Sequence, residues 1–333
     1  MKRVVWGVLS TARIGMNKVI PALLKSDLIR VKGIGSRSLV AAQQAVAKLG
    51  LEEAYGSYED LLADPEIEVI YNPLPNHLHV PMTLEAARAG KHVLCEKPMA
   101  LNAAEIEALR SIKDIYIQEA FMVRHSLQWI EARRLIRAGA IGQPQMIQSY
   151  FSYDNLDPGN IRNKVEWGGG GLLDIGCYPI VAGRFFFETE PERVMALIKR
   201  HETFGTDVIA SALLDFGHGR QLTFTVSTQA GRSQCINVFG TKARLSLPIP
   251  FNQPPDREQN IVIDNGATLD GGTAVTHTLP PADQYQLMAE AFCRAVRGEA
   301  PLPYGMDDAS ANMRIIDALF RSEQSGAWEE VAA

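Results

Sequence analysis

The feature that most constrains the fold is a regular alternation of short apolar runs and amphipathic stretches in the first third of the chain. A continuous apolar run, which is typical of a strand covered on both faces, occurs at Val4–Leu9, and further strands are predicted at Ile29–Gly35 and His92–Cys95. Apolar residues with helical spacing follow at 12–25, 39–49 and 80–89. Strands that alternate with helices of about 10 residues predict a parallel sheet wound by helices on both faces.

Shorter signals continue this alternation. Apolar strands are predicted at 69–71 and 115–118, and a helix is predicted at 102–111. Gly90 is placed to end the helix before it, and Ser57 stands three residues before Asp60 as the cap of a short helix. The first part of the chain is therefore predicted to be an α/β domain.

The second part of the chain follows a different pattern. In Gln221–Ser227 polar and apolar residues alternate strictly, as in a sheet with one wet face, and further strands are predicted at 145–153, 194–201 and 208–215. Residues 216–219 carry two glycines and predict a hairpin, and helices return at 283–297 and 306–322. We predict an α+β domain with an open, mostly antiparallel sheet, covering residues 123–333 after a first domain of 1–122.

Composition excludes several classes of protein. Hydrophobic residues make up 46% of the chain, enough for a sizeable core, and the net charge of −5 with no long basic run argues against nucleic acid or an anionic membrane as partner. Apolar stretches are far below the roughly 20 residues of a membrane helix, and the apolar run near Met1 is too short for a signal peptide. The four cysteines lack CxxC spacing, so neither a disulfide framework nor structural zinc is expected, and the cytoplasm is the predicted compartment.

The first strand–helix junction reads Gly7-Val8-Leu9-Ser10-Thr11-Ala12. A dinucleotide fingerprint needs a glycine for the tight turn, a second where the backbone nears the pyrophosphate, and a small third residue for helix packing. Gly7 and Ala12 fit the first and third places, whereas Leu9 stands in the middle one. Hydroxyls and free amides at Ser10 and Thr11 could still hold phosphate. An ordinary strand–helix turn is the alternative.

The end of the second strand carries information on cofactor selectivity. NAD-selective sites have an acidic residue there for the ribose 2′-hydroxyl. This chain has Gly35-Ser36-Arg37-Ser38 with no carboxylate, and a guanidinium suits a dianionic 2′-phosphate. NADP is therefore the predicted cofactor, with NAD as the alternative. A helix-capping serine beside a solvated arginine would explain the same residues without a ligand.

Two further segments follow predicted strands. Lys97, in Cys95-Glu96-Lys97-Pro98, stands at the carboxyl end of a parallel strand, where such sheets bind ligands. The run from Asn72 to His79 has two prolines and the polar side chains of Asn76, His77 and His79. The two histidines have no third ligand at a matching spacing, so no metal is predicted. A surface lysine at a proline turn is the alternative for Lys97.

The second domain contains a run of four glycines, Gly168 to Gly171, followed by Asp174 and Tyr178. Glycines allow a backbone to approach a ligand closely, and residues four apart share one side of a helix. Pro179 places the helix start nearby. A glycine hinge with a capping aspartate and a half-buried tyrosine is an equal alternative.

Taken together, Glu96-Lys97-Pro98, the Asn76–His79 loop and the glycine run with Asp174 resemble the glucose–fructose oxidoreductase/inositol dehydrogenase (Gfo/Idh/MocA) family over nearly the whole chain. Tyr178, in place of a histidine, resembles the branch with glucose–fructose oxidoreductase, NADP-dependent D-xylose dehydrogenase and dimeric dihydrodiol dehydrogenase. The resemblance implies a Rossmann domain, a C-terminal sheet that mediates a homodimer or homotetramer, and hydride transfer between a secondary alcohol or hemiacetal carbon and nicotinamide. The chain lacks the export signal and N-terminal arm of glucose–fructose oxidoreductase, so we expect a cofactor that dissociates in each turnover.

The resemblance also implies roles for particular residues. Tyr178 would exchange the hydroxyl proton, Lys97 would orient the hydroxyl and lower the pKa of Tyr178, and Asp174 would bind a neighbouring substrate hydroxyl and hold Lys97. Lys97 as the direct acid/base is the rival assignment. Substrate contacts are predicted from Lys97, Glu119, Trp167, Asp174 and Tyr178; an interdomain ion pair with Arg124 is the alternative for Glu119. Cofactor contacts are predicted from Gly7, Leu9, Ser10, Thr11, Ala12, Arg13, Ile14, Ser36, Arg37, Ser38, Leu74, Asn76, His77, His79, Glu96, Lys97 and Arg162.

The predicted function is therefore an NADP-dependent sugar dehydrogenase such as a D-xylose 1-dehydrogenase, with a small sugar, polyol, diol or carbonyl compound as partner. A trans-dihydrodiol dehydrogenase or carbonyl reductase is one alternative. A non-catalytic nucleotide-binding sensor or scaffold is another, as is glycoside cleavage through a 3-keto intermediate with tightly held NAD.

Overall fold

The computed structural model describes residues 2–331, and it divides them into two compact units. The first unit contains the described residues up to Met122 together with Tyr285–Ser310. The second contains Val123–Gln284 and the described residues from Ala311 onward. Residues 285–310, which the sequence analysis assigned to the second domain, thus pack with the first unit, because their apolar side chains complete its core.

The first unit is built on a six-stranded sheet in the order β3-β2-β1-β4-β5-β6, in which every neighbouring pair is parallel. This is the doubly wound order, and its crevice lies beyond the carboxyl ends of β1 and β4, where the strand order reverses. The strands are β1 (Val4–Leu9), β2 (Ile29–Gly35), β3 (Glu53–Tyr55), β4 (Val69–Asn72), β5 (His92–Cys95) and β6 (Ile117–Glu119).

Helices cover this sheet. They are η1 (Gly15–Val19), α1 (Ile20–Leu23), α2 (Leu39–Leu49), α3 (Tyr58–Ala63), η2 (Asn76–Leu78), α4 (His79–Arg88), α5 (Ala103–Glu107) and η3 (Ala108–Ser111). The late helix α8 (Gln284–Val296) joins them, since the indole N–H of Trp6 in β1 donates to the Cys293 sulfur at 3.3 Å and the Trp6 ring meets Phe292 edge to face. Trp6 is fully buried, so α8 covers part of the central strand β1.

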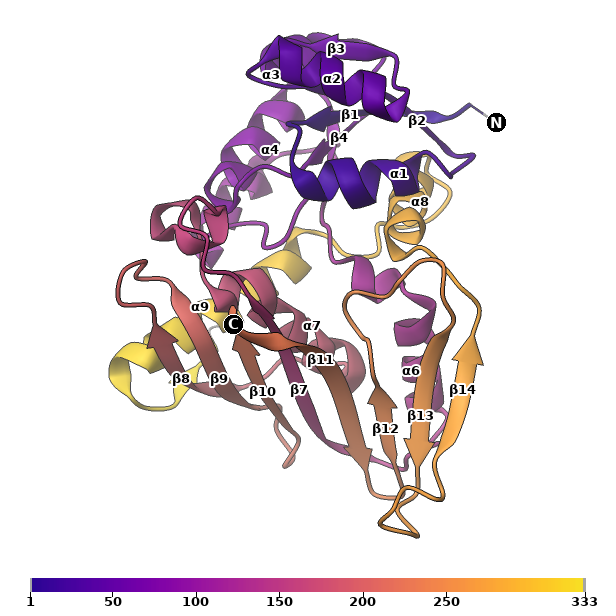
Figure 1. Cartoon of the computed structure of the whole chain (residues 1–333), viewed down its shortest axis with the longest axis vertical. Coiled ribbons are helices and arrows are strands. Elements are labelled where there is room, and N and C mark those ends of the chain that lie inside the picture. The colour runs from indigo at the N-terminus through magenta and orange to yellow at the C-terminus, as the bar shows by residue number, and fades with distance from the viewer. Residues whose placement is uncertain (1, 332–333) are drawn as a thin grey trace. The chain divides into compact units, whose positions relative to one another are not determined.

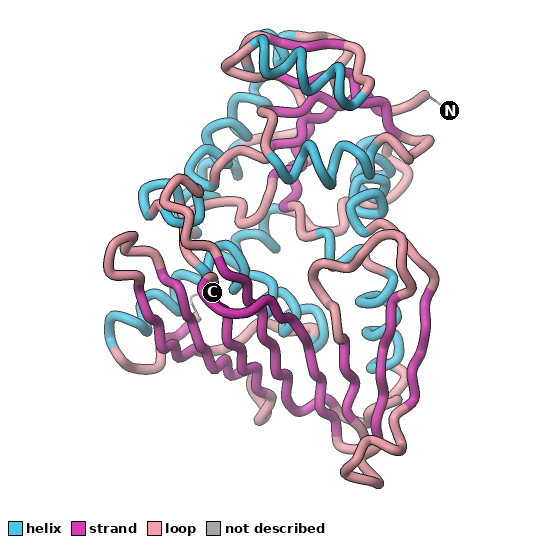
Figure 2. Tube along the Cα trace, in the orientation of Figure 1, coloured by secondary structure: helices cyan, strands magenta, loops and turns pink. Residues whose placement is uncertain are grey.

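The second unit is built on a nine-stranded sheet in the order β14-β13-β12-β11-β7-β10-β9-β8-β15 (Figures 1 and 2). All neighbouring pairs are antiparallel except β7 with β10, which run parallel. The strands are β7 (Pro144–Asp154), β8 (Arg193–Arg200), β9 (Asp207–Asp215), β10 (Gln221–Ser227), β11 (Gln229–Gly240), β12 (Arg244–Leu247), β13 (Gln259–Asp264), β14 (Val275–Leu279) and β15 (Glu329–Glu330).

Helices α6 (Leu127–Arg137), α7 (Cys177–Phe187) and α9 (Met306–Ser325) cover one face of this sheet (Figure 1). Trp129 of α6 is fully buried among Phe185, Phe186 and Phe251, and the amide of Ala196 in β8 donates to the Ser322 hydroxyl of α9. Alternate side chains of the central strands enter this core and the others face outward, which is the pattern that Gln221–Ser227 predicted.

Most predicted elements are confirmed within a few residues, including the strand–helix alternation and the β9–β10 hairpin. The sequence analysis missed α6, β3 and most of the strands after Ser227, whose polar, half-exposed residues give a weak periodic signal. No helix among residues 2–331 is long and apolar enough to cross a membrane. The four cysteines are free thiols.

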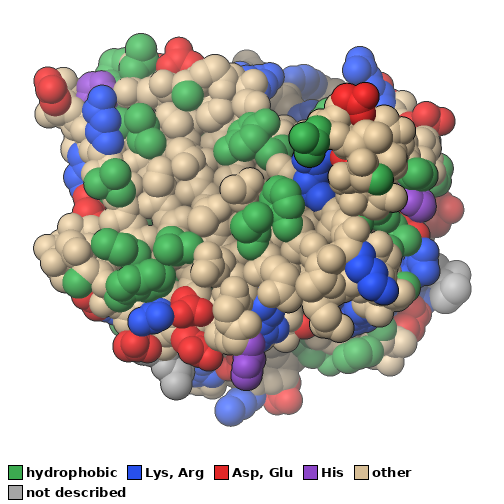
Figure 3. Space-filling model, turned by 90° about the horizontal axis from the view of Figure 1, so that it is seen from below, with side chains coloured by type: hydrophobic (Ala, Val, Ile, Leu, Met, Phe, Trp, Pro, Cys, Tyr) green, Lys and Arg blue, Asp and Glu red, His purple; other side chains and the backbone are tan. Residues whose placement is uncertain are grey.

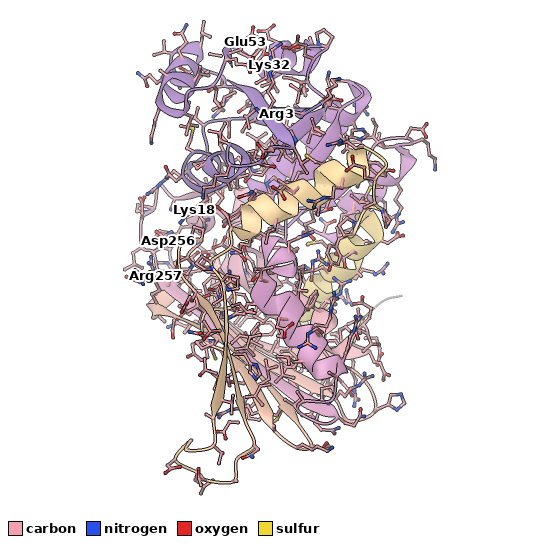
Figure 4. The ribbon with its side chains drawn as sticks, turned by 90° about the vertical axis from the view of Figure 1, so that its right-hand side faces the viewer. Arg3, Lys18, Lys32, Glu53, Asp256 and Arg257 are labelled. Atoms are coloured by element: carbon pink, nitrogen blue, oxygen red, sulfur yellow. The ribbon has the colours of Figure 1, made fainter. Side chains whose placement is uncertain are left out.

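Charged side chains cluster on the first unit away from its apolar core. Lys32 of β2 contacts Asp64 at 2.6 Å and Glu53 at 3.7 Å, and Figure 4 shows Lys32 and Glu53 lying close together. The Tyr55 hydroxyl donates to the same Asp64 at 2.5 Å. This ion-pair group joins β2 and β3 to the segment after α3, so we regard it as structural.

Candidate active site

The first strand–helix turn departs from the dinucleotide fingerprint at Ser10, not at Leu9 as the sequence analysis placed it. Ser10 has a φ of 65°, the left-handed conformation that favours glycine, whereas Leu9 is the last, fully buried residue of β1. The Ser10 hydroxyl accepts from the Ala12 amide at 3.2 Å. Packing around Gly7 is tight, since a Cβ there would lie 2.9 Å from the Cδ1 atom at the end of the Ile67 side chain.

The remaining residues of the turn lie at the helix start. Thr11, Ala12 and Ile14 are half-buried, and Arg13 is exposed. Amides at this position, at the carboxyl end of β1, are those that a doubly wound fold presents to pyrophosphate. The turn therefore fits a dinucleotide, with Ser10 supplying the backbone conformation that glycine usually provides.

At the end of β2 the two serines bind backbone amides, whereas Arg37 points its charge outward. Ser38 caps α2 by accepting from the Ala41 amide at 3.3 Å, and the buried Ser36 hydroxyl accepts from the Ser38 amide at 3.2 Å. Arg37 is exposed, and it lies near the Tyr58 hydroxyl at the start of α3: burial raises the pKa of Tyr58, and the positive charge of Arg37 opposes that rise. Sequence reasoning missed Tyr58, because the end of β2 and the start of α3 meet only in the folded sheet.

The loop after β4 is held by two buried side chains. Asn72 donates from its amide to the His79 carbonyl at 3.1 Å and to the Thr83 hydroxyl at 3.2 Å, and its oxygen accepts from the Leu74 amide. The two ring nitrogens of His79 lie 2.6 Å from the Leu74 carbonyl and 2.7 Å from the Pro98 carbonyl. His79 therefore joins the loops after β4 and β5.

This placement corrects one predicted contact. His79 is 1% exposed and engages backbone carbonyls, so it supports the cofactor loop and does not face a ligand. Burial lowers the pKa of His79 to about 4, with the positive charges of Lys97 and His77 adding to the effect. A neutral ring carries one N–H, so it donates to one of the two carbonyls in each tautomer. Leu74 is also buried, whereas Asn76 and His77 are half-buried in η2.

The segment after β5 contains the predicted catalytic lysine. Glu96 accepts from the fully buried Tyr71 hydroxyl at 2.6 Å, Lys97 is half-buried, and the Lys97–Pro98 peptide is cis. Glu119 in β6 is 1% exposed and accepts from the Met99 amide at 2.7 Å. Glu119 thus fixes the backbone after Lys97, a supporting position instead of the predicted substrate-lining one.

In the second unit, Asp174 is the centre of a hydrogen-bonded group. Its Oδ2 atom accepts from the Tyr153 hydroxyl at 2.5 Å and from Arg162 Nε at 2.9 Å. Asp174 is 9% exposed and lies in η7 (Leu172–Gly176), whereas Arg162 lies in the short turn η5 (Ile161–Asn163). The negative charge of Asp174 raises the pKa of Arg162, so this is a firm ion pair. Arg162, for which a cofactor contact is predicted, pairs with Asp174 in this structure.

Tyr178 lies one turn after Asp174, at the second position of α7. Its ring is 6% exposed and packs against Phe151 and Phe251, with ring centres 5.7 and 5.4 Å away. The aromatic contacts hold the ring in one orientation, which a proton-transferring hydroxyl requires. Trp167, in the turn η6 (Val165–Trp167), is half-buried, and Lys164 Nζ lies 4.3 Å from the centre of its ring.

The glycine run approaches the protein's own atoms. A Cβ on Gly169 would lie 2.5 Å from the Arg162 carbonyl, and one on Gly170, whose φ is 126°, would lie 1.9 Å from the Asp207 carboxylate. Asp207 accepts from the Leu172 amide at 2.5 Å and thereby fixes the start of η7. Sequence reasoning missed Asp207 and Tyr153, because each comes from a strand distant in sequence from Asp174.

Comparisons with known proteins agree with this architecture. Residues 4–114 match the model of an oxidoreductase family with an NAD-binding Rossmann fold, and residues 129–246 match the GFO/IDH/MocA C-terminal domain. An uncharacterized oxidoreductase of Rhizobium meliloti is 45% identical, covering 99% of this chain and 100% of its own. The D-xylose 1-dehydrogenase (NADP(+)) 2 of Haloferax volcanii is 35% identical, covering 98% and 99% of the two chains.

A solved structure extends the likeness to three dimensions. The 3-ketoreductase KijD10 of Actinomadura kijaniata, crystallised with NADP and TDP-benzene, superposes with a TM-score of 0.90 at 28% identity over 96% of this chain and 98% of its own. The chain belongs to the Gfo/Idh/MocA oxidoreductase family. It is an NAD(P)-dependent oxidoreductase with a Rossmann domain, as its sequence predicted.

Proposed function

We propose that this protein is an NADP-dependent dehydrogenase that oxidises a hydroxyl of a neutral sugar or polyol, with an aldose such as D-xylose oxidised at C1 as the leading candidate. The observation that carries the proposal is the end of β2, where Arg37 is exposed beside Tyr58 and no acidic residue stands in Ser36-Arg37-Ser38. A guanidinium pairs with a 2′-phosphate, whereas a 2′-hydroxyl needs a carboxylate. Likeness over nearly full length to an NADP-dependent D-xylose 1-dehydrogenase supports the same cofactor and substrate class.

The cofactor would be held by the turn from Gly7 to Ile14, by Arg37 and by the loops after β4 and β5. When bound, NADP⁺ accepts the hydride that leaves the carbinol carbon. Loss of that hydride requires removal of the hydroxyl proton, so a base must stand at the oxygen. The protein's contribution is therefore to orient the hydroxyl, to take its proton and to recognise its neighbours.

We assign the proton to Tyr178. An unperturbed tyrosine has a pKa of about 10, so it needs a cation nearby to act at neutral pH. Lys97 would supply that positive charge and orient the reacting hydroxyl, and Asp174 would accept a hydrogen bond from the adjacent hydroxyl of the substrate. In the rival assignment Lys97 exchanges the proton directly, since desolvation lowers the pKa of a lysine.

The test is a fluorescence titration of purified protein with NADPH and NADH, alongside Arg37→Ala. We expect NADPH to bind more tightly, and Arg37→Ala to weaken NADPH by about ten- to a hundredfold while leaving NADH nearly unchanged, since a charged hydrogen bond contributes about 1.5–3 kcal/mol. Arg88→Ala, at an exposed position of the same domain outside the predicted cofactor contacts, is the matched control. NADH binding as tight as NADPH would contradict the cofactor assignment.

A panel of substrates tests the reaction. Formation of NADPH from NADP⁺ with D-xylose, D-glucose and related aldoses is the expected result. Turnover of a trans-dihydrodiol or a simple ketone without turnover of any aldose would favour the dihydrodiol dehydrogenase or carbonyl reductase alternative instead. A cofactor that stays bound through purification would favour the non-net redox alternative.

We also propose that the second unit forms a homodimer or homotetramer through the open face of its sheet. Helices cover the other face, and the open face carries exposed apolar side chains at Met146, Met195, Leu197 and Ile209. Apolar side chains also gather between the charged ones in the view from below (Figure 3). Sedimentation analysis should give a dimer or tetramer that Ile209→Arg dissociates, and a wild-type monomer would contradict the proposal.

A further inference from the structure

The group around Asp174 contains one residue to which no role has yet been given, Tyr153 near the end of β7. Its hydroxyl and Arg162 Nε both donate hydrogen bonds to Asp174 Oδ2, at distances of 2.5 and 2.9 Å. The three side chains come from a strand, a turn and a helix that are distant along the chain. A convergence of this kind orients the shared carboxylate in one direction.

We propose that Tyr153 is a positioning residue: with Arg162 it holds Asp174 Oδ2, so that Oδ1 accepts the substrate hydroxyl next to the reacting carbon. The inference rests on the proposed function, and it names the substrate class as a neutral compound with two adjacent hydroxyls. Because the positive charge of Arg162 offsets the negative charge of Asp174, the pair has no net charge that would attract a cationic or anionic substrate.

Tyr153 acts as a donor in this arrangement. Burial and the negative charge of Asp174 raise the pKa of Tyr153 well above its usual value, so the phenol keeps its proton. An oxygen that receives two donors carries no proton itself, and Oδ2 is therefore an acceptor in both bonds. The carboxylate is thus presented as an acceptor to the substrate as well.

Fixing the carboxylate matters for selectivity. A site built to hydrogen-bond a substrate hydroxyl discriminates strongly against the analogue that lacks it, provided that the protein group is held in place. The Asp174 side chain is 12% exposed and that of Arg162 is 42% exposed, so the acid is the shielded member of the pair. Loss of the Tyr153 hydroxyl would remove one of the two donors at Asp174 Oδ2 and loosen the orientation of the carboxylate.

The neighbouring strand residues supply a control. Phe151 and Tyr153 lie on the covered face of β7, and the intervening pattern places Tyr150 on its open face, where it is 43% exposed. Tyr150→Phe therefore removes a tyrosine hydroxyl from the same strand without touching Asp174. Tyr153→Phe removes the donor to Asp174 and keeps the ring.

The experiment measures kcat and KM of the full-length protein with D-xylose and 2-deoxy-D-xylose, for wild type, Tyr153→Phe, Tyr150→Phe, Asp174→Asn and the Tyr153→Phe/Asp174→Asn double variant. We expect Tyr153→Phe to lower kcat/KM about tenfold for D-xylose and little for the deoxy sugar, so that the ratio between the two sugars shrinks about tenfold. The double variant should be no slower than Asp174→Asn, because Tyr153 acts through that residue. Thermal melts verify that each variant is folded.

Outcomes separate this inference from the proposed function. An unchanged sugar ratio in Tyr153→Phe, or a loss that adds in full to that of Asp174→Asn, overturns the inference while the function stands. An equal change in Tyr150→Phe also overturns it. If Asp174→Asn itself keeps wild-type kinetics, Asp174 has no role at the substrate and the inference fails while the function stands. If wild type turns over no aldose, the proposed function fails and the inference fails with it.

Discussion

The residues proposed for catalysis are held in different ways in the two units. In the first unit, side chains bond to the backbone: Asn72, His79 and Glu119 together contact main-chain atoms of Leu74, Pro98 and Met99. In the second unit, side chains bond to one another, as Tyr153 and Arg162 do on Asp174. Substitution of Asn72, His79 or Glu119 should therefore disturb the path of a loop, whereas substitution of Tyr153 or Arg162 should change the hydrogen bonds of one carboxylate.

The largest effect is expected for the two residues that we propose for proton transfer. Lys97→Met and Tyr178→Phe should each lower kcat by about 10²–10⁴-fold, since each removes a group needed for proton transfer. NADPH binding by Tyr178→Phe should be retained, which a fluorescence titration verifies. Lys113→Met, at an exposed position of the first unit, serves as control.

This pair of variants also decides between the two proton-transfer assignments. Near-normal turnover by Tyr178→Phe would contradict the role of the tyrosine and leave Lys97 as the direct acid/base. Loss of activity in both, with folding intact, would keep the assignment of one role to each unit.

A second prediction concerns backbone packing in the second unit. Gly170→Ala should destabilise the protein by about 3 kcal/mol or more, because its φ of 126° disfavours any side chain and a Cβ would lie 1.9 Å from Asp207. Chemical denaturation measures the loss. Gly231→Ala, where a Cβ would meet no atom within 4 Å, is the control. Equal stability of the two variants would mean that Asp207 does not fix this turn.

The third prediction compares one buried histidine from each unit. Burial lowers the pKa of His79 to about 4 and that of His125 to about 3, both below the usual value of about 6.5. The unfolded chain then binds more protons than the folded one below pH 6.5, so stability falls as the pH drops from about 6.5 to about 4. Each histidine contributes at most about 1.4 kcal/mol per pH unit in that window.

Thermal melts between pH 7 and pH 4 measure this dependence. His79→Gln and His125→Gln should each flatten the curve of Tm against pH. His79→Gln should in addition lower the Tm at pH 7, because it loosens the link between the loops after β4 and β5. A variant as pH-dependent as wild type would show that its histidine is not neutral in the fold.

The smallest effect is expected at Ser10. Ser10→Gly should stabilise the first unit by about 1 kcal/mol or less, because glycine adopts the positive φ of 65° without strain while the weak bond from the Ala12 amide is lost. Ser10→Ala keeps the strain and removes the hydroxyl, so it should be less stable than wild type. Denaturant midpoints of the three proteins give the order, and Ser10→Gly as the least stable would contradict this account.

The spacing of apolar and polar residues predicted many of the strands and helices, because that spacing repeats within a few residues of a single element. The buried strands from Val4 to Cys95 and the alternation in Gln221–Ser227 reflect the period of a single element. The same pattern did not predict the strand Gln229–Gly240, where only Ile236 and Val238 are buried. It also placed residues 285–310 in the wrong unit, since packing of Phe292 and Cys293 on Trp6 spans most of the chain.

The sequence by itself determined the family, the Rossmann domain and the positions of Lys97, Asp174 and Tyr178, because motifs record which residue types follow which element. Only the tertiary structure decided what each side chain touches. In the structure the residue with the left-handed conformation of the turn is Ser10. His79 and Glu119, for which ligand contacts were predicted, bind backbone atoms of neighbouring loops. Tyr153 and Asp207 contact the helix that carries Asp174. Apart from the turn at Ser10, these contacts join residues from different elements, and no local period or spacing encodes them.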